Sequence, residues 1–81
     1  MSATLPVIRR CMQTVLQLSD DQASQIDAQT TPVSLPSWNS LAHVHIILEL
    51  EREFSVTFDA GEIASLASVG AMMAALDRSR V

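Results

Sequence analysis

The stretch from Ser40 to Phe54, SLAHVHIILELEREF, is the most apolar in the chain and limits most what the chain can fold into. Its apolar residues recur at spacings of three and four in two neighbouring rows: Leu41, Val44 and Leu48, then Ile47, Leu50 and Phe54. A strand pattern also runs through it but breaks at Ile47, and the length and the Leu, Glu and Arg content favour a helix. We expect a central helix with both rows buried, because burying each such side chain stabilises the fold by about 1.5 to 3 kcal/mol.

Helical spacing also appears near both ends of the chain. From Thr4 to Leu18 one face carries Leu5, Ile8, Cys11, Met12, Val15 and Leu16. Near the other end, Ser68 is a predicted N-cap for a helix whose apolar face is Val69, Met72, Met73 and Leu76, and we expect both methionines to fill the core. Before it, residues 55–58 read as an extended connector and Asp59 as the N-cap of a helix of one or two turns.

Residues 19–39 contain two prolines and show no regular apolar period. We predict a long ordered loop there, attached to the core by four apolar residues: Ile26, Val33, Leu35 and Trp38. So long a connection within a small domain often has a function.

The composition agrees with a helical fold. The chain has 81 residues, 48% of them apolar but only 4% aromatic, with two glycines, which suits packed helices better than short strands. The predicted fold is all-α: one domain, residues 1–81, formed by a small four-helix bundle with a long first loop and a short third helix. A domain of this size has little room for an enclosed substrate cavity.

Charge and cysteine content exclude several classes of function. A net charge of -4 argues against nucleic-acid binding, because the chain offers no cluster of cations to the phosphate backbone. Cys11 is the only cysteine, so we expect no internal disulfide, a buried structural thiol and a cytoplasmic protein. The sequence predicts no metal site, no signal peptide and no membrane span.

Ser40 and His43 lie three residues apart and suggest a nucleophile with its base. The chain has no G-x-S-x-G motif and no evident acid to orient His43, so we predict that it is not an enzyme. His43 and His45 would point to different sides of a helix, and we expect both to be solvated surface residues.

The position of Ser40 leaves two interpretations. Ser40 follows Asn39 where a loop gives way to a helix, which a plain helix start explains. A hydroxyl in the first turn also lies beside unpaired backbone N–H groups at the positive end of the helix dipole, which favour an attached phosphodiester. The serine could therefore be a modification site.

The second interpretation, a modification site, is supported by a resemblance to known proteins. Asn39-Ser40-Leu41, followed by a helix with Glu49, Glu51, Glu53 and Phe54, resembles the prosthetic-group site of acyl carrier proteins and the related peptidyl carrier domains. The resemblance covers nearly the whole chain, because "EIASLASVGAMMAAL" is similar to their short third helix and their fourth helix, and the loop before Trp38 is similar to their first loop.

The resemblance implies a carrier that catalyses nothing. Ser40, flanked by Asn39 and Leu41, would receive 4'-phosphopantetheine from coenzyme A through a magnesium-dependent phosphopantetheinyl transferase, and the thiol of the arm would hold a thioester. Further partners would be an acyl- or aminoacyl-loading ligase and downstream synthase enzymes. They would contact a surface formed by Trp38, His45, Glu49, Glu51 and Arg52.

This chain departs from the usual family pattern at two places. Asn39 stands where the family usually has aspartate, and Arg52 interrupts the acidic end of the helix. The departures predict a dedicated biosynthetic pathway rather than general fatty-acid synthesis. We expect a freestanding monomer that begins at Met1, and the alternative is an unmodified helical adaptor that binds proteins through the same helix face.

Overall fold

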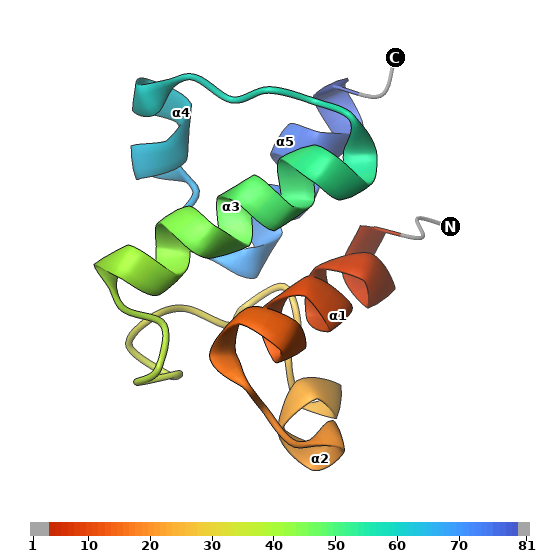
Figure 1. Ribbon diagram of the computed structural model, residues 1–81, viewed down its shortest axis with the longest axis vertical. Coiled ribbons are helices and arrows are strands. Elements are labelled where there is room, and N and C mark those ends of the chain that lie inside the picture. The colour runs from red at the N-terminus through yellow and green to blue at the C-terminus, as the bar shows by residue number, and fades with distance from the viewer. Residues whose placement is uncertain (1–3, 80–81) are drawn as a thin grey trace.

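The computed structural model describes residues 4–79, and within that range it forms five helices and no strand. They are α1 (Thr4–Leu16), α2 (Asp20–Ser24), α3 (Ser40–Phe54), α4 (Ala60–Ser65) and α5 (Val69–Ser79) (Figure 1). The all-α prediction is confirmed, with one short helix more than the predicted four. The expectation about the Met1 start lies outside the described residues.

Helix α3 runs through the middle of the molecule, with α1 beside it, α5 behind it and α4 near its first half (Figure 1). Its N-cap is Asn39, whose side-chain oxygen accepts a hydrogen bond from the Ala42 N–H at 2.9 Å, and its C-cap is Ser55, which has a left-handed φ of 54°. Ile46, Ile47 and Leu50 point into the core and are at most 1% exposed. The prediction of a central helix is confirmed.

Only one side of α3 is buried, so the prediction that both apolar rows are buried is wrong. The α3 outer row, defined as Leu41, Val44 and Leu48, is exposed at 67%, 45% and 55%. The spacing of these residues is helical, as predicted, but α1 packs against another side of α3. In so small a bundle, one side of the central helix remains without a neighbour.

The core joins residues from every helix except the short α2 and α4, together with residues from the loops. Helices α1, α3 and α5 supply most of it: Ile8, Cys11, Met12, Ile46, Ile47, Leu50, Val69, Met72, Ala75 and Leu76. The loops add Ile26, Trp38, Phe58 and Leu66. Met72 is fully buried and Met73 packs against the cluster, which confirms their predicted role as core residues.

Helix α2 corrects the prediction that residues 19–39 have no regular structure. Ser19 accepts a hydrogen bond from the Gln22 N–H, and the Gln22 side chain accepts one from the Ser19 N–H, at 3.1 and 2.9 Å. This reciprocal capping box stabilises a helix start even where no apolar period marks the helix. The S-x-x-Q spacing of Ser19 and Gln22 was a visible signal for it.

The remainder of the loop is attached to the bundle largely as expected. Ile26 and Trp38 are 2% exposed and Leu35 is half-buried, but Val33 is 93% exposed, so its predicted anchoring role is wrong. The loop also binds the start of α5, because the Thr30 and Ala28 carbonyl oxygens accept hydrogen bonds from the Val69 and Gly70 N–H groups at 3.0 and 2.8 Å.

Both remaining predicted caps are present. Asp59 caps α4 by accepting a hydrogen bond from the Glu62 N–H at 2.8 Å, and the Ser68 hydroxyl oxygen accepts one from the Ala71 N–H at 3.0 Å. None of the helices within residues 4–79 has the length and apolar character needed to cross a bilayer.

Cys11 gives the stability of this fold a testable pH dependence. Burial, and then the charges of Glu53 and Glu49, raise the pKa of the Cys11 thiol from 9.0 to about 11, against a smaller opposing effect of Arg10. The unfolded chain therefore loses the thiol proton first. The stabilisation is complete below pH 9 and is lost as the pH rises from 9 to 11.

The chain has no tyrosine and no lysine, the other side-chain types whose ordinary pKa lies in this interval. We expect the free energy of unfolding, measured by urea titration, to fall between pH 9 and 11 in the wild type and to stay nearly level in Cys11→Ala. An equal fall in both proteins would assign the effect to another group.

Candidate functional site

Ser40 is the first residue of α3, and its side chain is exposed. The capping role belongs to the residue before it, Asn39, whose backbone carbonyl also accepts a hydrogen bond from the His43 N–H at 2.8 Å. The hydroxyl of Ser40 is therefore not needed to start the helix. It lies beside first-turn N–H groups, which carry the positive end of the helix dipole.

A surface pocket of about 390 Å³ opens next to Ser40. Three parts of the chain form it, namely the end of the long loop, the first turn of α3, and α4 with the residues that follow it. Its lining residues are Pro32, Trp38, Asn39, Ser40, His43, Ala64 and Ala67.

His43 connects all three parts of this site. The Trp38 indole N–H donates a hydrogen bond to His43 Nδ1 at 3.0 Å, and His43 Nε2 lies 2.9 Å from the Ile63 carbonyl oxygen of α4. The rings of Trp38 and His43 stack, with their centroids 5.8 Å apart. His43 is half-buried, so the prediction of a solvated surface histidine is wrong for His43, whereas His45 is exposed as expected.

The same contacts argue against a catalytic pair of Ser40 and His43. Each ring nitrogen of His43 is engaged by another group, one by the Trp38 N–H and the other by the Ile63 carbonyl oxygen. A general base needs a free ring nitrogen within hydrogen-bond reach of the nucleophile. In this arrangement neither ring nitrogen of His43 is free to accept the proton of the Ser40 hydroxyl.

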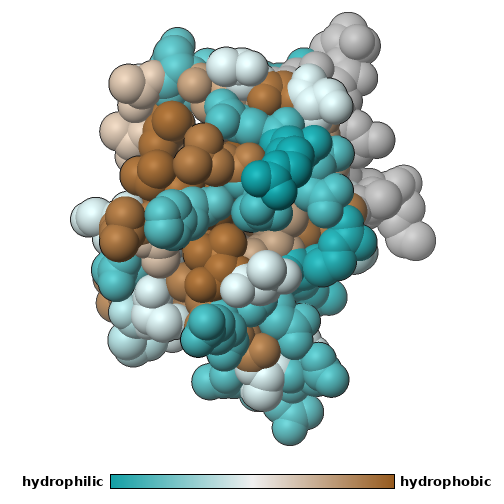
Figure 2. All heavy atoms as spheres, viewed as in Figure 1, coloured by the Kyte–Doolittle hydropathy of each residue, from teal (hydrophilic) through white to brown (hydrophobic). Residues whose placement is uncertain are grey.

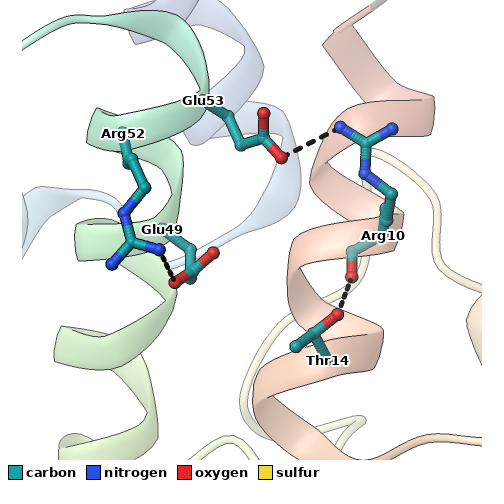
Figure 3. Close-up of polar contacts among 5 residues, drawn as sticks. All are labelled: Arg10, Thr14, Glu49, Arg52 and Glu53. Carbon is teal, nitrogen blue, oxygen red and sulfur yellow. Dashed lines mark hydrogen bonds and ion pairs between the residues drawn. The ribbon is translucent and has the colours of Figure 1, made fainter.

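The glutamates in the second half of α3 all have partners within the chain. Glu49 pairs with Arg52 at 3.3 Å, and Glu53 pairs with Arg10 of α1 at 3.0 Å (Figure 3). Glu51 accepts a hydrogen bond from the Phe58 N–H at 2.7 Å, which holds the connector after α3. The acidic charge at this end of α3 is therefore partly neutralised and partly used to hold the fold.

The outward side of α3 carries exposed apolar side chains among polar ones. The α3 outer row is exposed, and Figure 2 shows hydrophobic residues gathered where α3 and α4 lie, with hydrophilic residues around α2. A shallow pocket of about 270 Å³ continues this surface, lined by Val15, His45, Leu48, Glu49 and Arg52.

Similarity to known proteins is found at the level of the fold. No family model matches the chain, and a search of curated proteins found no match. A solution NMR structure of the holo acyl carrier protein from Geobacter metallireducens superimposes with a TM-score of 0.83 and 23% sequence identity, covering 96% of this chain and 86% of that one. The chain has the acyl-carrier-protein fold.

Within this acyl-carrier-protein fold, the residues singled out by the sequence lie in three places. Trp38, Asn39 and Ser40 line the pocket at the start of α3, with Leu41 exposed beside them. His45, Glu49 and Arg52 line the shallow pocket on the outward side. Glu51 is set apart by its bond to the connector, and Trp38 offers little surface to a partner because it is only 2% exposed.

Sequence reasoning did not place the pocket walls supplied by Pro32, Ala64 and Ala67. Small residues and prolines carry no pattern that links segments so far apart in the chain. The role of His43 was missed for the same reason, because its bond to Ile63 spans 20 residues. Among the described residues, no group of three or more His, Cys, Asp or Glu side chains could hold a metal ion.

Proposed function

We propose that this chain is a carrier protein that is modified on Ser40 with 4'-phosphopantetheine. The observation that carries the proposal is the exposed Ser40 hydroxyl at the first position of α3, beside a pocket, in a chain with the acyl-carrier-protein fold. The group would supply a terminal thiol on which an acyl or aminoacyl cargo is held as a thioester.

The residues around Ser40 fit such a group. The first-turn N–H groups and the helix dipole favour a phosphodiester on the Ser40 oxygen, and Asn39 keeps α3 capped without adding a negative charge beside it. In the modification, the Ser40 oxygen forms a bond to phosphorus and the pyrophosphate bond of coenzyme A breaks. Adenosine 3',5'-bisphosphate leaves, and the hydroxyl proton passes to a base of the transferase.

The chain itself would catalyse no reaction. Its function would be to present the tethered cargo to a loading ligase and then to downstream synthase enzymes, at a high effective concentration.

We assign it to a dedicated pathway because Asn39 and Arg52 make the region around α3 less negative than the usual acyl-carrier pattern. This assignment would be contradicted if the fatty-acid ketosynthase of the same cell elongated cargo on this carrier as readily as on its main fatty-acid carrier. The single buried Cys11 suits the reducing cytoplasm.

We propose that partner enzymes dock on the α3 outer row, next to His45 and Arg52. The row is exposed and apolar, whereas Glu49 and Glu53 are paired within the chain. Exposed ion pairs contribute only about 0 to 1 kcal/mol, so apolar contact should dominate docking.

Leu48→Asp is therefore expected to raise the transferase KM about tenfold, because the variant loses an apolar contact with the transferase and places a charge in the interface. Glu53→Gln, which removes a charge paired with Arg10, should change the KM by less than about threefold. Steady-state kinetics of modification measure both effects, and the opposite ranking of the two variants would show that docking is electrostatic.

The proposed function is tested by intact mass spectrometry. The purified protein is incubated with coenzyme A, magnesium and a transferase of broad specificity, and its mass is compared before and after. We expect a gain of one phosphopantetheine. No gain from a folded sample with two different transferases would reject the carrier and leave an unmodified adaptor that binds proteins through the α3 outer row.

A further inference from the structure

The hydrogen bonds of His43 specify one protonation state of its ring. The Trp38 indole N–H can only donate, so His43 Nδ1 must accept, and the Ile63 carbonyl oxygen can only accept, so Nε2 must carry the proton. Both bonds are made at the same time only by the neutral ring with its proton on Nε2. The Trp38–His43–Ile63 bridge, as we call these two bonds, therefore joins the loop, α3 and α4 through one side chain.

Helix α4 depends on such contacts for its position. It has only six residues and none of them is fully buried, although Ile63 is half-buried against the core. A helix of this length is not stable by itself, so tertiary contacts must hold it. Phe58 before it and Leu66 after it are buried, and His43 attaches its last turn directly to α3.

Ser40 lies between the two side chains of the bridge in the sequence and lines the same pocket as both. Trp38 precedes it by two residues and His43 follows it by three, while Ala64 and Ala67 form the opposite wall of the same pocket. The bridge thus sets where the α4 side of the pocket stands relative to the Ser40 hydroxyl.

We propose that His43 is a positioning residue for the modification of Ser40. It acts through α4: by holding the Ala64 and Ala67 wall in place, it gives the transferase a preformed surface around the hydroxyl. This inference rests on the proposed function. Loss of the bridge leaves α4 mobile, so each encounter with the transferase must first order it, and that cost lowers affinity rather than the rate of the chemical step.

The first readout is the kinetics of modification. His43→Phe keeps a ring next to Trp38 but removes both hydrogen bonds, and we expect the transferase KM to rise about tenfold with kcat nearly unchanged. His43→Gln supplies one acceptor and one donor, so it should restore the KM to within about threefold of the wild type. Trp38→Phe, which removes the indole N–H together with part of the buried indole ring and leaves the bond to Ile63, should give an intermediate KM.

Ile8→Val is the control for a general loss of stability, because it removes one buried methyl group from α1, a helix that contributes no residue to the bridge or to the lining of the Ser40 pocket. Its KM should equal that of the wild type. A similar rise of the KM in Ile8→Val and His43→Phe would overturn the positioning role.

The second readout needs no modification of the protein. Amide hydrogen exchange, followed by NMR on the unmodified chain, should become about tenfold faster in α4 of His43→Phe and remain unchanged in α1. Unchanged exchange in α4 would show that the bridge does not hold this helix. Faster exchange with an unchanged KM would show that the bridge serves structure alone, and either result overturns the proposal.

Failure of the proposed carrier function can be distinguished from failure of the positioning role of His43. A wild type that gains no mass rejects both proposals at once. A wild type that is modified, with His43→Phe modified at the same KM, rejects only the positioning role of His43.

Discussion

Ser40→Ala will abolish the attachment of phosphopantetheine and leave the free energy of unfolding within about 0.5 kcal/mol of the wild type. The two effects separate because the Ser40 side chain is exposed and Asn39 caps the helix. Alanine is well tolerated in a first turn whose cap is intact. Intact mass measures the first effect and urea unfolding the second.

Ser37→Ala is the matched control for this variant. Ser37 is an exposed serine three residues earlier, in the loop before α3, and its replacement should leave the mass gain unchanged. A mass gain that persists in Ser40→Ala would place the attachment on another residue. A mass gain that is lost in both variants would point to a damaged loop rather than a missing acceptor.

Gly70→Ala will destabilise the protein by about 1 to 3 kcal/mol, through a clash between the loop and α5. A Cβ at this position would lie 2.8 Å from the Ala28 carbonyl oxygen, which is closer than real Cβ contacts allow. That oxygen cannot withdraw freely, because it accepts the Gly70 N–H at 2.8 Å and the neighbouring Val69 N–H bonds to Thr30. Relief of the clash would break the contact that attaches the loop to α5.

Gly61→Ala makes the same chemical change where space allows it. A Cβ at Gly61, in the exposed α4, would meet only the Asp59 side-chain oxygen at 3.4 Å. Alanine suits a helix better than glycine by about 0.5 to 1 kcal/mol, so this variant should be slightly more stable than the wild type. Urea midpoints compare the two variants, and equal losses in both would show that the approach of the loop to α5 is not what constrains Gly70.

Local interactions made much of this fold predictable from the sequence. The period of three and four over Ser40 to Phe54 and the capping side chains of Asn39 and Asp59 act within a single turn, so they can be identified without knowledge of the fold. The start of α2 was local in the same way, through Ser19 and Gln22, but without an apolar period it went unrecognised. The place of Ser40 at the start of α3 followed from these local signals.

Only the tertiary structure decided which side of α3 is buried. The row of Leu41, Val44 and Leu48 and the row that contains Ile47 and Leu50 have similar apolar residues at similar spacing. The packing of other helices on one side buries Ile47 and Leu50 and leaves the α3 outer row exposed. Burial depends on neighbours that are distant in the sequence, and no period within α3 records where they lie.

The same reason explains why the bridge beside Ser40 could not be predicted. Trp38 and His43 are close in sequence, but the Ile63 carbonyl oxygen that completes the bridge belongs to another helix. A backbone carbonyl has no residue identity, so a sequence cannot mark it as a partner. The sequence by itself determined the described helices other than α2 and the position of the serine. Tertiary packing decided what surrounds that serine, because those contacts form only once distant segments meet.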